Sequence, residues 1–520
     1  MELDRKYVTL HHRRGEAISQ MTLEEDMNVP DQKPDIFRIV HSQGEFRPDE
    51  TRGESGKMKV RGVFLYRILY IGENAGRMPE VLEGSIPIDE TVFLNDLEEG
   101  DVLDFRWELE DLHVSAIHSR KINVKGVLAL CAEAWKEQPV PLVGCTDMGN
   151  DLYTQTCPVR IQQEVIHKKD TLRIREEVNL PPGRPNIRRI IWKEMRLQGT
   201  EVRPGEGKLL AKGELAVFFL YECEDDSGHI QWLEQTIPYQ QEVECERSHG
   251  DLTGKAETKL LRGEMELQPD YDGEPRIVRV DAVLELTGRY FEEMTSEVLC
   301  DAYSLSREII PERKTYVWTF VPGISDSRAR AGGRMKLPET APGMLQILQT
   351  GAAVHLDHTE RCERGILLQG NVALWVLYAA SDDAQPVACA VHAFPFEHTA
   401  ELSEIREDCQ WQTSLCLDQL QVLMMDAQEL EMKAVLKIQV LLMKPEELTL
   451  VEELQEDPLD KELRKKLPGM VIHVVQPGET LWDISKACAT TVDAVRTLNE
   501  LKEEELKPGQ KLLLVKEVVR

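Results

Sequence analysis

The sequence lacks the long apolar run that a membrane-spanning segment needs. No stretch approaches the roughly 18 consecutive apolar residues that cross a bilayer. The first residues, Met1 to Gly15 (MELDRKYVTLHHRRG), lack the apolar core of a signal peptide. We therefore expect a soluble, cytoplasmic protein with no transmembrane segment. At about 100 to 200 residues per domain, its 520 residues predict about three to five domains.

Basic residues are also fewer than acidic residues. The chain has 62 Lys and Arg residues against 92 Asp and Glu residues, which gives a formal net charge of −30. Such a chain repels a phosphate backbone unless its basic residues are strongly segregated. The basic cluster RPNIRRIIWK (Arg184 to Lys193) lies among acidic stretches and indicates a solvated face. Nucleic acid is therefore not an expected partner.

Paired cysteine motifs are missing as well. The 11 cysteines are an odd number, have no CxxC spacing and are scattered from Cys131 to Cys488. This distribution favours a reducing compartment over a disulfide framework. We expect the thiols to serve as small buried apolar groups.

Catalytic motifs are absent too, since the sequence contains no GxSxG, HExxH or GxGxxG. PGEGK (residues 204–208) fails as a phosphate loop because Val202 and Leu209 stand where that motif requires Gly and Ser or Thr. HLDH (His355 to His358) offers two imidazoles and a carboxylate, but no further metal ligands are evident, which favours hydrogen-bonded or surface histidines. We predict no catalytic residue, no metal and no cofactor, and an enzyme hidden in the repeats is the weakest alternative.

What the sequence does contain is a threefold repeat. VPDQKPDIFRIV (residues 29–40) recurs as LPPGRPNIRRII (residues 180–191) and LPETAPGMLQIL (residues 337–348), each with the pattern PxxxP. At constant spacing behind these prolines, each copy repeats a glycine, a tyrosine that ends an apolar run and a further proline: Gly62, Tyr70 and Pro87; Gly213, Tyr221 and Pro238; Gly370, Tyr378 and Pro395. The pattern predicts three copies of one folding unit.

Each copy is typical of antiparallel β-structure. Short runs of Val, Ile, Leu, Phe and Tyr alternate with charged residues and are bounded by Gly, Asp and Asn turns. Runs such as AVFFLY, apolar on both faces, indicate the middle of a sandwich. We therefore predict a mainly β, multidomain chain with three β-sandwich-like modules at residues 20–145, 165–305 and 330–445.

Two connecting segments carry their own expectations. The PxxxP segments restrict φ twice within a short length, which predicts a rigid arm before a short helix. Residues 446–468 are acidic and then basic, and we expect a charged, partly helical linker there.

Residues 469–517 predict a small βααβ domain. HVVQ (residues 473–476) alternates as a strand, and Pro477 and Gly478 form a turn. Thr480 and Asp483 fit a capping box for a helix that places Leu481, Ile484 and Cys488 on one face.

The second half of this domain mirrors the first. Thr490 and Asp493 fit a second capping box, and Asn499 suits a left-handed residue at the end of the second helix. KPGQKLLLV (residues 507–515) then predicts a turn and a return strand.

The segment VVQPGETLWDISKACATTVDAVRTLNELKEEELKPGQKLLLV is similar to a LysM domain over its whole length. The resemblance implies a groove for N-acetylglucosamine-containing glycans between the first strand-to-helix turn and the loop before the last strand. Its two walls match Gly478, Glu479, Thr480 and Leu481, and Leu506, Lys507 and Pro508.

Two departures from the LysM pattern bear on the ligand. Cys488 and Ala489 stand where a small glycine is usual, and Glu503, Glu504 and Glu505 precede the second wall. An acidic rim gives no advantage toward a neutral sugar, which favours a protein ligand. Trp482 has two interpretations: packing beneath the small sheet, or forming part of the partner-facing surface.

The whole arrangement, PxxxP-led SPOCS-type β-rich modules ahead of one LysM domain, resembles the SipL and SpoVID group of spore coat morphogenetic proteins, SipL more closely. The resemblance implies a mother-cell protein at the forespore surface and spore coat. Its LysM domain would dock on the coat-basement morphogenetic ATPase and promote encasement of the forespore, with other coat proteins as further partners. The alternative is a peptidoglycan-binding protein that takes glycan through its LysM groove.

Overall fold

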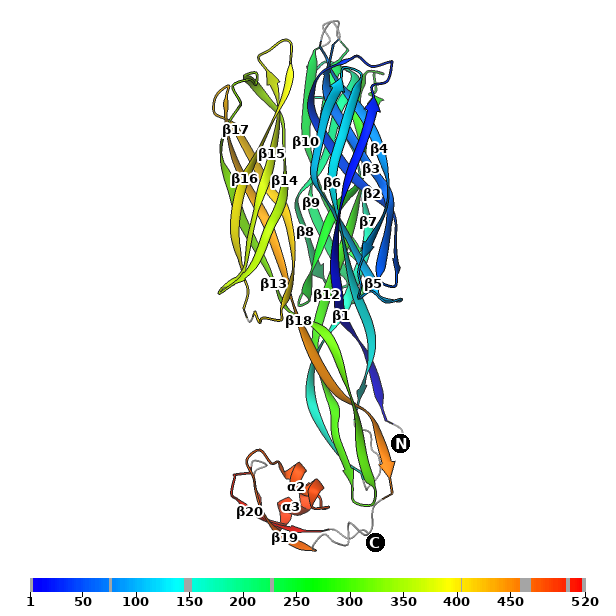
Figure 1. The fold of residues 1–520 in the computed structure, drawn as a ribbon, viewed down its shortest axis with the longest axis vertical. Helices are drawn as coiled ribbons and strands as arrows, with labels where there is room; N and C mark the ends of the chain where they lie inside the picture. Colours follow the sequence, from blue (N-terminus) through cyan, green and yellow to red (C-terminus); the bar gives the residue numbers. More distant parts are fainter. Residues whose placement is uncertain are drawn as a thin grey trace.

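The computed structural model describes residues 3–73, 77–144, 152–224, 229–403, 405–458, 469–501 and 506–516. Three β-modules lie side by side, and their longest strands continue downward as a stalk that ends beside a small α/β domain (Figure 1). Each module consists of two three-stranded antiparallel sheets. The predicted fold class, mainly β with repeated antiparallel modules, is confirmed.

The three modules have the same strand order. In the first, the two sheets are β1 (Arg5–Asn28), β6 (Lys121–Val143) and β5 (Val102–His118), and β2 (Ile36–Glu54), β3 (Lys57–Gly72) and β4 (Pro79–Phe93). In the second they are β7 (Leu152–Asn179), β12 (Pro275–Ser304) and β11 (Thr253–Pro269), and β8 (Ile187–Gly205), β9 (Lys208–Cys223) and β10 (Ile230–Glu244). In the third they are β13 (Glu308–Lys336), β18 (Glu429–Asp457) and β17 (Gln410–Met424), and β14 (Met344–Cys362), β15 (Gly365–Ala380) and β16 (Val387–Glu401).

Each module is a sandwich because its central strands alternate apolar and polar residues. In the first module, Val60 and Phe64 of β3 share one buried core with Val124 and Leu128 of β6. Equivalent cores fill the second and third modules. The repeat prolines lie on the edge strands β4, β10 and β16, where a missing N–H disturbs no ladder.

The repeated residues have specific structural roles. A side chain at Gly62 would collide with the Arg47 carbonyl oxygen, so glycine lets two strands approach closely. Tyr70 donates its hydroxyl hydrogen to the Pro34 carbonyl oxygen at 3.1 Å. The PxxxP segment and the strand-end tyrosine therefore form the two halves of one contact.

The short helix expected after PxxxP is absent, and that prediction is wrong. The Lys33 N–H bonds the Pro30 carbonyl in a turn, and Ile36 already begins β2 opposite Gly72. The Pro34 carbonyl accepts its hydrogen bond from Tyr70 and not from a helix N–H. The chain therefore passes from the turn into β2 without a helix.

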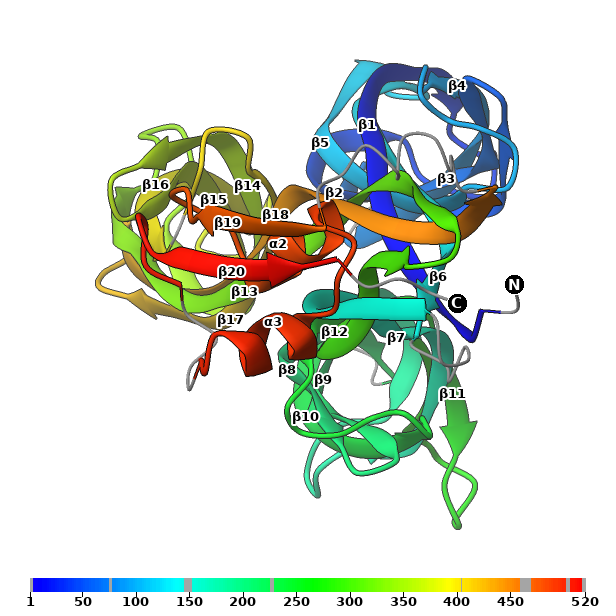
Figure 2. The same cartoon turned by 90° about the horizontal axis from the view of Figure 1, so that it is seen from below.

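The three modules are packed around a common centre (Figure 2). Leu69, Leu220 and Leu377 directly precede the three repeat tyrosines, and all three are fully buried in one shared cluster. Lower down, in the stalk, Leu10 and Val298 share a core with Trp318. The modules are therefore joined into one body at two levels.

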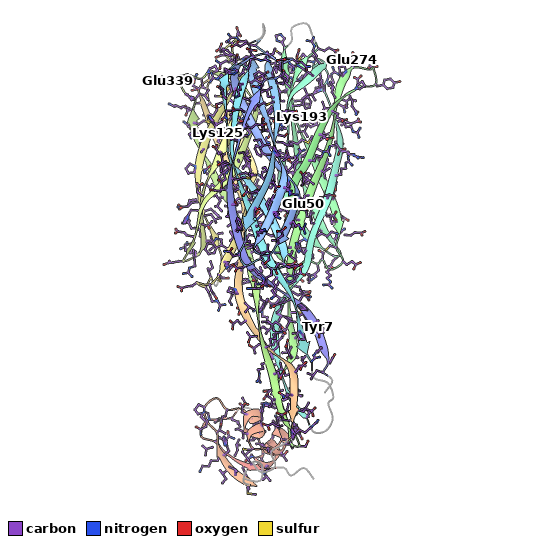
Figure 3. All side chains as sticks on the ribbon, turned by 45° about the vertical axis from the view of Figure 1, so that its right-hand side comes forward. Tyr7, Glu50, Lys125, Lys193, Glu274 and Glu339 are labelled. Atoms are coloured by element: carbon purple, nitrogen blue, oxygen red, sulfur yellow. A yellow bond between two sulfur atoms is a disulfide. The ribbon has the colours of Figure 1, made fainter. Side chains whose placement is uncertain are left out.

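The stalk consists of strand segments that the sequence did not reveal. β1 begins at Arg5, well before residue 20, and Tyr7 lies on the stalk (Figure 3). Residues 446–457, expected as a linker, form the end of β18, and this prediction is wrong. Leu448, Leu450 and Leu454 alternate there with polar residues and pair with β13. Residues 459–468 lie outside the described residues.

A disulfide joins Cys157 of β7 to Cys300 of β12, so the expectation that the cysteines are small buried thiols is wrong for these two. Cys157 pairs opposite Val298, and a bulge between Leu299 and Asp301 adds Cys300 to its strand. The two Cα atoms come to 6.0 Å, within disulfide reach. Among the other described cysteines some are buried, including Cys223 and Cys409, whereas Cys416 is exposed.

The C-terminal domain has the predicted order, β19 (Met470–Val474), α2 (Leu481–Ala487), α3 (Val492–Leu498) and β20 (Lys511–Val515). The helices pack on the two-stranded sheet through a core that includes Leu481, Ile484, Val495, Leu512 and Leu514. Neither these nor any other helix in the described part of the chain has the length and apolar character that a bilayer span requires.

The helix caps were predicted in part. Thr480 and Asp483 form the expected capping box of α2. The second box is wrong, because the cap of α3 is Thr491, whose hydroxyl accepts from the Ala494 N–H. The left-handed residue is Glu500, at φ 51°, and not Asn499.

Candidate binding site on the C-terminal domain

The two loops that the sequence predicts as groove walls lie side by side. Val475, just before the first loop, donates its N–H to the Gln510 carbonyl at 2.9 Å. Its carbonyl accepts from the Gly509 N–H, also at 2.9 Å. Val475 therefore connects the start of the first loop to the end of the second loop, at one end of the two paired strands.

Glu479 and Thr480 hold the first loop in shape. The Glu479 carboxylate accepts from the Gln476 N–H at 2.7 Å and contacts His473 Nε2 at 2.8 Å. The Gln476 hydrogen bond, followed by that of His473, lowers the pKa of the Glu479 carboxyl. The Thr480 side chain caps α2. These polar groups are therefore largely occupied within the domain.

The second loop is closed by its own turn. Lys507 donates its N–H to Gln510 Oε1 at 3.0 Å, and its carbonyl accepts from the Gln510 N–H at 2.9 Å. The turn needs glycine at Gly509, where φ is 85°. Lys507 and Pro508 are consequently exposed.

The predicted site residues thus differ in what they can offer a ligand. Leu481 is 5% exposed and belongs to the domain core, against which Leu506 also packs. Gly478, at φ 86°, presents an exposed stretch of backbone. Among the predicted residues, the groups open to a ligand are this backbone, the Thr480 surface, Lys507 and Pro508. The predicted acidic rim at residues 503–505 lies outside the described residues.

Trp482 leaves its own domain and lies against the stalk. Its Nε1–H donates to Asp301 Oδ2 of β12 at 2.8 Å. Its ring meets that of Tyr303 edge-on, with centroids 4.8 Å apart. Neither neighbour was a sequence candidate, because no local pattern connects residues 181 positions apart.

The HLDH segment does not form a metal site. In the part of the chain that the structure describes, no group of three or more His, Cys, Asp or Glu residues is arranged to hold a metal ion. His355 Nδ1 lies 3.0 Å from Glu108 Oε1 of the first module, and this hydrogen bond raises the pKa of His355. His358 lies 3.7 Å from Glu360. The segment therefore contributes a contact between modules.

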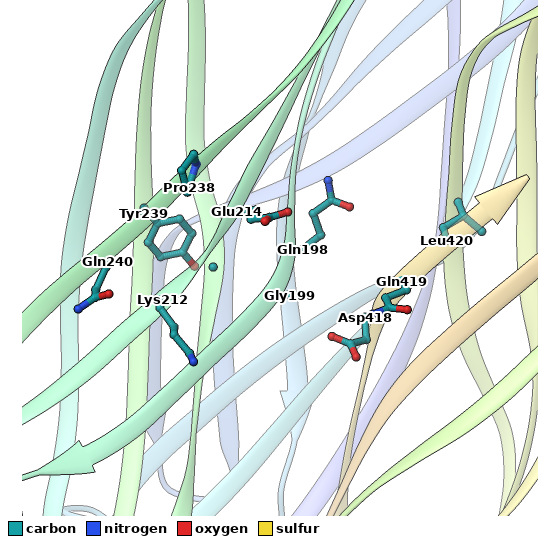
Figure 4. Close-up of a pocket in the computed structure, with 11 residues that line it drawn as sticks. Gln198, Gly199, Lys212, Glu214, Pro238, Tyr239, Gln240, Asp418, Gln419 and Leu420 are labelled. Carbon is teal, nitrogen blue, oxygen red and sulfur yellow. The ribbon is translucent and has the colours of Figure 1, made fainter.

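A cavity of about 690 Å³ lies between the second and third modules. Figure 4 places Gln198 and Glu214 on one side and Asp418 and Gln419 on the other. Each side includes a β-bulge, and these bulges recur at the same positions of the other modules.

Comparison with protein-family models gives a match to the SipL, SPOCS domain over residues 35–117, 186–260 and 344–425, and to the LysM domain over residues 473–515. The chain is a SipL-type protein with three SPOCS domains and a C-terminal LysM domain. Both are non-catalytic binding domains, and the SPOCS domains associate the chain with sporulation. The resemblance inferred from the sequence is confirmed.

One curated relative supports the LysM assignment. The chain is 47% identical over 45 residues to "Probable endopeptidase p60" of Listeria monocytogenes serovar 1/2a (strain ATCC BAA-679 / EGD-e). The match covers 9% of this chain and 9% of that relative, so the chain spans less than a tenth of the relative's length. No solved structure matches the chain.

Proposed function

We propose that this SipL-type chain is a non-enzymatic scaffold in spore coat assembly, acting from the mother-cell cytoplasm at the forespore surface. Its LysM domain docks on the coat-basement morphogenetic ATPase and so promotes encasement of the forespore. The SPOCS modules bind or position other coat proteins. The observation that carries the proposal is the architecture itself: three SPOCS domains around one centre, with a LysM domain at the far end of the stalk (Figure 1).

The rigidity of the body supports a scaffolding role. Leu69, Leu220 and Leu377 bury a shared apolar cluster, so the modules present fixed surfaces relative to one another. The edge strands β4, β10 and β16 each contain a proline, which disfavours uncontrolled strand addition. Strand addition by a partner is therefore disfavoured at these three edges.

The open groups of the LysM groove support a protein ligand. Lys507 supplies an exposed cation beside Pro508, and Gly478 supplies exposed backbone. Such a combination suits a peptide segment that carries a carboxylate, whereas a neutral sugar gains nothing from the cation.

The test is a pull-down of the ATPase and of insoluble peptidoglycan by the full chain. We expect the ATPase to be retained, and Lys507→Glu to weaken its retention at least about fivefold through charge repulsion. Lys511→Glu, at another exposed lysine of the same domain, serves as the matched control and should change retention little. Retention on peptidoglycan with no binding of the ATPase would contradict the proposal.

The second candidate is binding of peptidoglycan glycan through the same groove. It is favoured by the LysM match and by the 47% identity over 45 residues to the listerial protein. In that case the peptidoglycan pellet retains the full chain, and Lys507→Glu has little effect on binding of N-acetylglucosamine oligomers, which are neutral. Neither candidate requires a cofactor or nucleic acid.

A further inference from the structure

A single carboxylate of the stalk holds two side chains of the LysM domain. Asp301 of β12 accepts from Trp482 Nε1 at 2.8 Å. Both of its oxygens also lie 2.7 Å from Lys486 Nζ. Burial raises the pKa of the Asp301 carboxyl, but the hydrogen bonds from Lys486 and Trp482 outweigh it and the pKa is lowered. The carboxylate is therefore held ionised against the LysM domain.

Tyr303, two residues further along β12, forms the apolar half of the same contact. Its ring stacks on Tyr153 with centroids 5.2 Å apart and meets Trp482 edge-on. Its hydroxyl donates to the Thr490 carbonyl at 3.0 Å. Tyr303 is only 5% exposed although it lies at the end of the stalk. Aromatic contacts with polar ends are typical of protein interfaces.

The stalk side of the contact is held by its own strand pairing and by a hydrogen bond within the stalk. Asp301 and Tyr303 are two residues apart in the regular stretch of β12 that follows the bulge at Cys300, so their side chains share a face. Arg313 donates to the Cys300 carbonyl at 3.0 Å, and β12 pairs with β7 on both sides of the bulge. The surface therefore does not depend on the LysM domain for its shape.

The LysM side is equally specific. Trp482 and Lys486 lie four residues apart on α2, which places them on one face of the helix. Thr491, and not Thr490, caps α3, and the Thr490 carbonyl accepts from Tyr303. The residue next to the α3 cap is therefore part of the contact with the stalk.

We propose that the end of the stalk, formed by Tyr153, Asp301 and Tyr303, is a docking surface for the LysM domain of the same chain. Docking covers Trp482 and leaves the exposed groove residues Gly478, Lys507 and Pro508 open. A partner that uses only the groove binds the docked domain, whereas one that needs Trp482 must displace the stalk. The inference goes beyond the proposed function and holds whichever ligand the groove takes.

Hydroxyl-radical footprinting of the full chain, read by mass spectrometry, tests the docking. Tyr303 should be protected in the unmodified chain, and Lys486→Met should raise its oxidation rate at least about threefold. Lys511→Met removes a lysine of the same domain away from α2 and should leave Tyr303 protected. Lys486 and Lys511 are both exposed, so neither substitution threatens the LysM core.

Two results would overturn the proposal. In the first, Tyr303 is oxidised as fast in the unmodified chain as in Lys486→Met. In the second, its protection falls when the chain is diluted about a hundredfold, because the occupant is then the LysM domain of a second copy. Protection that is independent of concentration and lost in Lys486→Met supports docking within one chain.

Discussion

Tyr70 donates its hydroxyl hydrogen to the Pro34 carbonyl oxygen at 3.1 Å, and the same bond recurs between Tyr378 and Pro342 at 3.1 Å. A strand end in one sheet is thereby attached to the PxxxP turn that leads into the neighbouring strand. In the first and third modules the bond gives a physical reason for the constant spacing between the PxxxP segment and the tyrosine.

Removing this hydroxyl should destabilise the first module. Tyr70→Phe leaves the Pro34 carbonyl without its donor and should lower the free energy of unfolding by about 1 kcal/mol. Tyr221→Phe is the matched control, because the Tyr221 hydroxyl is buried without a hydrogen-bond partner among the described residues. Thermal unfolding followed by calorimetry checks both variants. Equal destabilisation by the two would contradict the role of the Pro34 bond.

The repeat glycine should tolerate no side chain. In Gly62→Ala the new methyl group meets the Arg47 carbonyl oxygen and the Phe46 ring, so we expect a loss of about 1–3 kcal/mol of unfolding free energy. Gly323→Ala is the control, since a Cβ there meets no atom within 4 Å. Urea denaturation measures the difference, and a neutral Gly62→Ala would remove steric approach as the reason for the glycine.

His355 should make one module contact sensitive to pH. Its pKa is raised by the hydrogen bond to Glu108, with Asp357 and Glu110 adding to the effect. A raised folded-state pKa means that the stabilisation is present below the unfolded value of about 6.5 and is lost as the pH rises through the folded value.

The matched pair for that prediction is His355→Gln and His358→Gln. Because Glu108 is 54% exposed, we expect His355→Gln to cost no more than about 0.5 kcal/mol at pH 6 and nothing measurable at pH 9. His358 is the control because it is 59% exposed and its neighbour Glu360 lies on its own strand. A cost that is the same at both pH values would exclude titration of His355 as its source.

His41 should make the stability of the fold depend on pH in the opposite direction to His355. It is partly buried between Trp192 and Trp375, and desolvation followed by the charge of Arg67 lowers its pKa to about 4. The neutral form is favoured in the fold, so stability is present above about pH 6.5 and is lost as the pH falls toward 4.

The expected loss at His41 is on the order of 3 kcal/mol across that interval. His41→Gln introduces the residue that stands at the same repeat position of the third module, Gln349. The variant should unfold with a weaker dependence on pH between 4 and 6.5. An unchanged acid-denaturation profile would show that another group controls acid stability.

Local patterns sufficed for much of the fold. The repeat spacing predicted three antiparallel modules because each copy must place the same glycine, tyrosine and proline in the same sheet. Apolar spacing and the Thr480 cap predicted the LysM order, since caps and apolar periodicity are signals within a few residues of sequence. Leu481 and Leu506 were identified by resemblance as groove residues, and the structure shows that both pack with the domain core.

Contacts between distant segments could not be predicted. Thr490 and Thr491 are equally good caps in the sequence, and the choice falls on Thr491 while Tyr303 engages the Thr490 carbonyl. Likewise, Val8 pairs with Val140 in the stalk, and Cys157 meets Cys300 only because a bulge shifts β12. Each of these pairings depends on tertiary packing, which leaves no periodic signal.

The central claim is that the LysM domain of this chain docks on the coat-basement morphogenetic ATPase. The most direct measurement is the affinity of the purified full chain for that ATPase, with Lys507→Glu and Lys511→Glu measured alongside. We expect saturable binding that Lys507→Glu weakens at least about fivefold and Lys511→Glu leaves nearly unchanged. The absence of saturable binding to the ATPase, with saturable binding of the same chain to peptidoglycan, would contradict it.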